Sequence, residues 1–227
     1  MKPTDAFADL LRLNRPVIET REAATRLGLS VPAASQQLRS LERSGIVRRL
    51  RQGLWLLRPE TEPFALPAYL TAPYPAYVSL WSALARHGMI EQVPRQVYVA
   101  SLARTRQVRT SIGDFSIHHL APELFGGYSQ IDGGGHLATP EKALFDTIYL
   151  LTPRGGQIRL PELELPEGFD ERQLGEWTHR IHRPRLRTIV SRELTAALRS
   201  ADAREHPVRC SDPTPFPSSA RPSTTIV

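Results

Sequence analysis

The chain has 227 residues, of which 41% are hydrophobic and 23% are charged, a composition typical of globular proteins rather than disordered ones. No apolar run is long enough to cross a bilayer, and the first residues lack the pattern of a secretory signal peptide. We therefore expect a cytoplasmic protein with no membrane partner. A single cysteine, Cys210, excludes an internal disulfide and a thiolate zinc site.

The formal net charge of +6 is unevenly distributed along the chain. Residues 1–58 carry 11 basic and 5 acidic side chains, whereas residues 59–227 carry 18 of each. Lys2 and Lys142 are the only lysines, so the abundance of arginine indicates a bias in composition more than a function. The position of the excess charge predicts a basic N-terminal module beside a neutral body.

Three helices are expected in the basic module. The apolar spacing over residues 5–13 predicts the first. Thr20 is expected to cap the second, which ends at Gly28, because glycine readily adopts the left-handed conformation of a helix end. Ser30 is expected to cap the third, which runs to Ser44.

Strand-forming residues flank and follow these helices. Residues 17–18 form a short extended piece, and residues 46–49 and 54–57 predict two strands joined by a turn at residues 51–53. Three helices followed by a basic hairpin are the order of a winged helix-turn-helix, which we assign to residues 1–58.

The sequence of residues 59–227 predicts a domain of mixed helices and strands, followed by a tail. Residues 59–63 are predicted to form a linker and residues 64–200 a second domain. The helices expected in this domain lie near residues 79–87, 139–151, 170–181 and 184–199. Its strands are expected at residues 96–100, 108–111 and 115–119 and between the glycines at 126–127 and 133–135. Residues 201–227 are rich in proline, serine and threonine, which predicts a disordered tail. The predicted fold class is α+β.

The third helix has a surface that suits the major groove of DNA. Placing Ala34, Leu38 and Leu41 on the buried side turns a set of small and polar residues outward: Ala33, Gln36, Arg39, Ser40 and Arg43. Small residues permit close approach, glutamine can pair with adenine, and arginine can pair with guanine or phosphate. The alternative is an ordinary solvated helix face.

The hairpin adds four residues suited to phosphate or to the adjacent minor groove: Arg48, Arg49, Arg51 and Gln52. The alternative here is a solvated hairpin tip, or a helix-turn-helix that binds protein rather than DNA. The excess basic charge favours DNA, because phosphate neutralisation requires it.

No catalytic motif is recognisable. The glycines at 133–135 are not followed by the Gly-Lys-Ser/Thr of a phosphate-binding loop, and the serines lack a nucleophile elbow. Pro140, two residues before Lys142, excludes the Glu-x-Lys motif of metal-dependent nucleases. Of the seven histidines, His118, His119 and His136 could meet in space but have no acidic or thiolate partner at metal-ligand spacing. His179 and His182 lie three residues apart on an expected helix, among arginines rather than further metal ligands. We expect no enzyme, no cofactor and no metal.

Several strings in the second domain have a familiar order. They are Tyr77–Gly88 (YVSLWSALARHG), Ile90–Pro94 (IEQVP), Gly113–His119 (GDFSIHH), Leu124–Tyr128 (LFGGY) and Leu137–Asp146 (LATPEKALFD). Together with the basic module, they make residues 10–195 resemble the AbiEi family of antitoxins and transcriptional regulators from type IV toxin–antitoxin systems.

The resemblance implies a winged helix-turn-helix followed by an α+β antitoxin domain. It implies binding of double-stranded DNA at inverted repeats in the protein's own promoter, and repression of a two-gene operon. It also implies a nucleotidyltransferase-like toxin, which the antitoxin counteracts without needing a stable complex. The strings at residues 87–88 and 139–148 are interpreted as fold determinants, namely a helix end and a helix start with its buried stripe. The alternative is a partner surface, for which the exposed candidates are Glu91, Arg95, Lys142 and Asp146.

The sequence therefore predicts a DNA-binding transcriptional repressor that resembles an antitoxin. Two alternatives remain: a stand-alone winged-helix regulator, and a protein-interaction module without a toxin partner.

Overall fold

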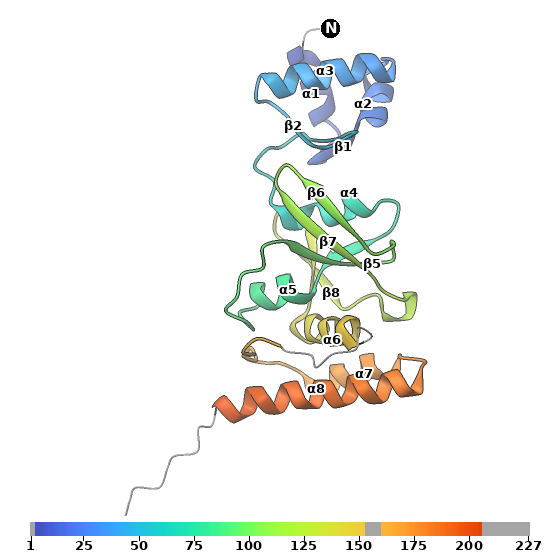
Figure 1. The fold of residues 1–227 in the computed structure, drawn as a ribbon. Helices are drawn as coiled ribbons and strands as arrows, with labels where there is room; N and C mark the ends of the chain where they lie inside the picture. Colours follow the sequence, from blue (N-terminus) through green and yellow to red (C-terminus); the bar gives the residue numbers. More distant parts are fainter. Residues whose placement is uncertain (1–2, 153–159, 206–227) are drawn as a thin grey trace, which may run out of the picture.

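The computed structural model describes residues 3–152 and 160–205, which form an α+β protein with two separate sheets. The predicted fold class is confirmed at this level. Figure 1 shows the layers stacked along one long axis, with the N-terminal helices at one end and the last two helices at the other.

The N-terminal part contains a small sheet and three helices. Its elements in chain order are α1 (Pro3–Leu11), β1 (Val17–Glu19), α2 (Thr20–Leu27), α3 (Val31–Arg43), β2 (Arg48–Arg51) and β3 (Leu54–Leu56). The strand order is β1-β3-β2, and both pairs are antiparallel. The extended piece predicted at residues 17–18 is thus a paired strand, and α1 ends two residues before its predicted limit.

The boundaries of α2 and α3 follow from local chemistry. Gly28 ends α2 at a φ of 64°, and the side chain of Ser30 accepts a hydrogen bond from the Ala33 N–H at 3.4 Å at the start of α3. Both boundaries agree with the prediction. The capping role predicted for Thr20 is wrong, because the N-cap position is Glu19 and Thr20 is the first helical residue.

The larger part is built on a mixed six-stranded sheet of order β6-β7-β5-β4-β9-β8. Its strands are β4 (Ala76–Val78), β5 (Val97–Ser101), β6 (Arg106–Thr110), β7 (Gly113–His119), β8 (Tyr128–Ile131) and β9 (Gly135–Ala138). The β6–β7 hairpin and the strands β5 and β8 were predicted, whereas the central strands β4 and β9 were not. Short helical pieces η1 (Pro63–Ala65), α4 (Pro67–Thr71) and η2 (Pro122–Leu124) lie between these elements.

Helices α5 (Leu80–Arg86) and α6 (Pro140–Leu151) were both predicted. Thr139 caps α6 by accepting a hydrogen bond from the Lys142 N–H at 3.3 Å, and Pro140 occupies the first turn. Residues 141–148 are all buried. Because α6 lies between the sheet and the last two helices, it is buried on every side rather than along one stripe (Figure 1).

Helices α7 (Glu171–His179) and α8 (Pro184–Glu205) cover α6. Residues 201–205, predicted as the start of a disordered tail, belong to α8, and the rest of that predicted tail lies outside the described residues. Across residues 3–152 and 160–205, no helix combines the length and apolarity needed to cross a membrane.

The central strand of the small sheet, β3, is buried on both faces. One face packs against the N-terminal helices through Ile18, Trp55 and Leu57. The other contributes Val17, Leu50, Leu54 and Leu56 to a cluster that continues into the larger part through Val99, Val108, Phe115 and Ile117. The Ser111 N–H at the tip of the β6–β7 hairpin donates to the Leu50 carbonyl at 3.1 Å. The two parts of the chain therefore share one apolar layer.

Candidate nucleic-acid interface

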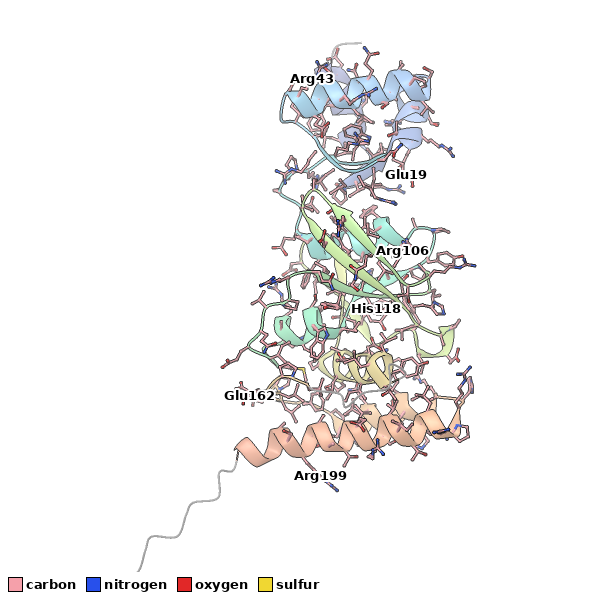
Figure 2. All side chains as sticks on the ribbon, in the orientation of Figure 1. Glu19, Arg43, Arg106, His118, Glu162 and Arg199 are labelled. Carbon is pink, nitrogen blue, oxygen red and sulfur yellow. The ribbon has the colours of Figure 1, made fainter. Side chains whose placement is uncertain are left out.

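Helix α3 lies at one end of the molecule with one face buried. Ala34, Leu38 and Leu41 are each 0% exposed, as the helical spacing predicts. The opposite side is open, and Figure 2 shows Arg43 at the end of the molecule farthest from Arg199. The five outward residues predicted from the sequence are exposed or half-buried.

These outward residues of α3 are divided between two hollows. The first hollow, which we call the α3 groove, has a volume of about 320 Å³ and is lined by Leu29, Ala33, Gln36, Gln37, Ser40 and Arg43. Four of the predicted site residues therefore meet there. Arg39, which is one turn from Arg43, faces the second hollow instead.

The second hollow lies between α2, α3 and the β2–β3 hairpin and has a volume of about 590 Å³. We call it the arginine basin, after the four arginines in its lining: Arg21, Arg39, Arg49 and Arg51. Gln52 also lines it, and Glu19 is its one acidic residue. None of the four arginines makes a salt bridge within the described residues.

The electrostatics of the basin favour an anion. Four guanidinium groups around one concave surface repel one another, and their field lines converge in the hollow. Arginine also suits phosphate particularly well, because its planar group presents paired N–H donors. An anionic ligand with several charged groups, spaced like phosphates along a backbone, would relieve this repulsion.

The hairpin turn at residues 51–53 is exposed, and hydrogen bonds to Thr20 anchor it to the start of α2. The carbonyl of Gly53 accepts hydrogen bonds from the Thr20 N–H at 2.9 Å and from the Thr20 hydroxyl at 3.3 Å. The same hydroxyl accepts from the Trp55 indole N–H at 2.9 Å, and the Arg49 guanidinium lies 5.8 Å from the centre of the Trp55 ring. Thr20 thus fixes the turn that presents Arg51 and Gln52.

Arg48 is the predicted site residue that the fold separates from the others. It is paired with Leu56 across the β2–β3 ladder, whereas Arg49 is paired with Trp55. Paired side chains leave a sheet on the same face, so Arg48 leaves it on the face toward the larger part. Arg48 is exposed, but it lines neither the α3 groove nor the arginine basin.

Two further residues that line these hollows were missed in the sequence. Arg21 reaches the basin from the first turn of α2, and Gln37 lines the α3 groove. The Nε2 atom of Gln37 is buried and has no hydrogen-bond partner in the described structure. Arg21 could have been found from its position at the start of a helix beside a basic hairpin, whereas nothing local distinguishes Gln37 from other polar residues.

The exposed partner surface predicted around Lys142 and Asp146 is wrong. Both side chains are 0% exposed and form a salt bridge inside the larger part. Asp146 also accepts hydrogen bonds from the hydroxyls of Tyr77 at 2.9 Å and Ser79 at 2.7 Å. The Lys142 ammonium lies 4.6 Å from the centre of the Trp177 ring.

Burial has the largest influence on the pKa of both members of this pair. It raises the pKa of Asp146 and lowers the pKa of Lys142, and the charge of each partner opposes these shifts. Burial and the neighbouring Asp146 charge also raise the pKa of Tyr77, so its phenol remains a donor. The group acts as an internal polar contact between α6 and the sheet, while Glu91 and Arg95 remain exposed.

One serine–histidine pair lies in the larger sheet. The Ser116 hydroxyl and His118 Nε2 are 2.9 Å apart, but both residues are buried and line none of the hollows named above. Within the described residues, no group of three or more histidine, cysteine, aspartate or glutamate side chains could hold a metal ion.

The sequence matches no protein-family model and no curated protein.

Proposed function

We propose that residues 1–58 form a winged helix-turn-helix and that the chain is a transcriptional repressor that binds double-stranded DNA. One observation carries this proposal: the α3 groove and the arginine basin lie on either side of a single exposed helix at one end of the molecule. The α3 groove is mainly polar, with two small residues in its lining, and the arginine basin is strongly basic. This combination suits double-stranded DNA, which presents base edges that a protein can recognise and a charged phosphate backbone.

The proposed binding mode places α3 in the major groove. An α-helix with its side chains is about 10–12 Å wide, and the major groove is about 12 Å wide. Ala33 and Ser40 permit close approach, so that Gln36 and Arg43 reach base edges, while Arg49 and Arg51 bind phosphate. The excess of basic charge in residues 1–58 supports this arrangement.

For the larger part we propose the role of an antitoxin of the AbiEi type. Its support is the resemblance of the strings between residues 77 and 146, together with the α+β class of the fold. In this proposal the protein represses its own operon at inverted repeats and counteracts a nucleotidyltransferase-like toxin encoded beside it. Co-expression of the adjacent gene tests this half: the toxin alone should arrest growth, and this protein should restore it. If this protein does not relieve the growth arrest, the antitoxin role is excluded, and the alternative of a stand-alone regulator replaces it.

Two double variants test the division between base reading and phosphate binding. We expect Arg49→Ala with Arg51→Ala to weaken binding to all duplexes equally, because phosphate contacts carry no sequence information. We expect Gln36→Ala with Arg43→Ala to reduce discrimination between the upstream duplex and a random one, by about 1–3 kcal/mol for each bidentate hydrogen-bonded pairing with a base that the variant removes. Fluorescence anisotropy with both duplexes measures the two effects.

Arg199→Ala is the matched control, because Arg199 is exposed on α8 at the opposite end of the molecule (Figure 2). It removes one arginine charge without touching either hollow, so its affinity should match that of the unmodified protein. If Arg199→Ala weakens binding as much as the basin variant, net charge alone governs binding. If the unmodified protein shifts no duplex, the protein-interaction alternative replaces this proposal.

A further inference from the structure

The outer face of α8 carries a regular row of arginines. Arg185, Arg192 and Arg199 follow one another at intervals of seven residues, and all three are exposed. Seven residues make almost two helical turns, so the three side chains leave the helix on nearly the same side, about 10.5 Å apart along its axis. We call this row the α8 arginine stripe. The opposite side of the helix is buried through Val190 and Leu194.

The positive charge of the stripe is only partly balanced within the chain. Arg185 and Arg199 make no salt bridge within the described residues, and Arg192 contacts Glu193, its neighbour in sequence, at 2.8 Å. The spacing along the stripe is close to the Debye length of about 10 Å at 0.1 M salt, so neighbouring guanidinium groups still repel one another. Carboxylates placed at the same spacing would relieve this repulsion and pair with each arginine in turn.

The residues between the arginines leave room for a partner to approach closely. Thr188, Thr195 and Ala196 are small and exposed, and they lie on the same side of α8 as the stripe. Packed helices have axes about 8–10 Å apart, depending on the side chains at the contact. Charged side chains that repeat every seven residues beside such a contact form salt bridges with the facing helix. The stripe therefore matches a second helix with acidic side chains at the same period.

Two other anionic surfaces fit the stripe less well. Residues 160–201 contain seven arginines and seven acidic residues, so a long phosphate backbone would meet repulsion as well as attraction there. An amphipathic helix binds a membrane surface through an exposed apolar face, whereas the apolar face of α8 is buried. A helix about 10–12 Å wide can follow the stripe without covering the rest of this layer.

We propose that the α8 arginine stripe is a docking surface for an acidic α-helix of a partner protein, with glutamate or aspartate at every seventh position. A second copy of the chain is a poorer occupant, because two stripes face to face would bring arginine against arginine. Figure 1 shows α8 as the outermost element at the end opposite α3, so the partner helix and DNA would bind at separate ends. This inference is independent of the DNA-binding proposal.

A synthetic peptide tests the proposal with the full-length protein. The probe is an alanine-rich helical peptide as long as α8, with three glutamates seven residues apart. The control peptide has the same composition, but its glutamates are five residues apart, which turns them to three different sides of the helix. Fluorescence anisotropy at low salt should show that the probe binds more tightly than the control peptide by roughly tenfold, because two of the three pairs are lost in the control.

Two triple variants show whether the stripe itself is the binding surface. The stripe variant carries Arg185→Gln, Arg192→Gln and Arg199→Gln. The matched control variant removes the same charge from exposed positions away from the stripe and carries Arg95→Gln, Arg104→Gln and Arg172→Gln. The stripe variant should bind the probe peptide more weakly by roughly ten- to a hundredfold, about two- to fivefold for each exposed pair. The control variant should bind it as the unmodified protein does.

Four outcomes would overturn the proposal. The first is that neither peptide binds, or that both bind equally, because spacing would then play no part. The second is equal affinity of the stripe variant and the control variant for the probe. The third is a loss of affinity for the upstream duplex in the stripe variant alone, which would assign the stripe to nucleic acid. The fourth is self-association of the unmodified protein that the stripe variant loses in analytical ultracentrifugation, which would assign it to a second copy.

Discussion

Replacing Lys142 by methionine tests whether the polar pair inside the larger part is as fully enclosed as its geometry indicates. Lys142 and Asp146 are both 0% exposed, and the Lys142 ammonium lies 4.6 Å, 5.1 Å and 5.7 Å from the ring centres of Trp177, Phe145 and Tyr77. A thioether fits among these rings. What the variant removes is the positive charge beside the Asp146 carboxylate.

The expected cost is large because the remaining group is buried. Removing one partner of a buried ion pair typically costs about 3–5 kcal/mol, since the other charge is left uncompensated. The Tyr77 and Ser79 hydroxyls continue to donate to Asp146, which keeps the cost within this range rather than above it. For a protein of this size, each kcal/mol corresponds to a fall in Tm of about 2–4 °C, so we expect a fall of about 6–20 °C.

Urea unfolding followed by tryptophan fluorescence measures this cost, and Arg12→Met provides the matched control. Arg12 pairs with Asp9 at the surface, where its side chain is 72% exposed, and exposed pairs contribute about 0–1 kcal/mol. Equal losses from Lys142→Met and Arg12→Met would refute the enclosed pair. In a double-mutant cycle, Lys142→Met with Asp146→Asn should cost less than the sum of the two single variants.

Three further substitutions test local features of the fold by urea unfolding. Gly135→Ala should be strongly destabilising, because an added Cβ would lie 2.3 Å from the Phe64 carbonyl oxygen; an unchanged midpoint would show that the backbone moves aside at no cost. Gly175→Ala, in the exposed part of α7, where the added Cβ would meet no atom within 4 Å apart from its chain neighbours and its own helix backbone, should instead stabilise by about 0.4–1 kcal/mol, and a loss would mean that α7 needs glycine there. Gln37→Leu should raise the free energy of unfolding by about 1 kcal/mol by removing a buried unpaired donor, whereas a fall would show that this amide is satisfied.

Helix boundaries could be predicted from the sequence because they depend on single residues. Ser30 and Thr139 both cap helices with their side chains, and Gly28 ends α2 in the left-handed conformation. The buried face of α3 also followed from spacing alone, since a surface helix alternates between core and solvent. Thr20 was misassigned because its hydroxyl bonds to the hairpin 33 residues away, a contact that no local pattern encodes.

The arrangement of the larger part could not be predicted in the same way. Strands β4 and β9 have three and four residues, too few to show a periodic pattern, although they are central in the sheet. Lys142 and Asp146 were expected at the surface because charged residues usually lie there, but α6 is enclosed by apolar residues on all sides.

The candidate site, like the fold, could be predicted from the sequence only in part. The small polar residues of α3 were identified from helical geometry, but their separation into two hollows depends on where the hairpin packs. A signal for that packing was present: Leu54–Leu57 is a continuous apolar run, typical of a strand covered on both faces rather than of a solvated hairpin.

Affinity for the upstream duplex as a function of salt tests the central claim most directly. If the four basin arginines each neutralise one phosphate, log K should fall with log salt at a slope of about −3.6, a loss of roughly 150-fold between 50 and 200 mM salt. Arg49→Ala with Arg51→Ala should halve this slope to about −1.8, while Arg199→Ala leaves it unchanged. An affinity that does not vary with salt, or a slope that the basin variant leaves intact, would contradict DNA binding through this end of the molecule.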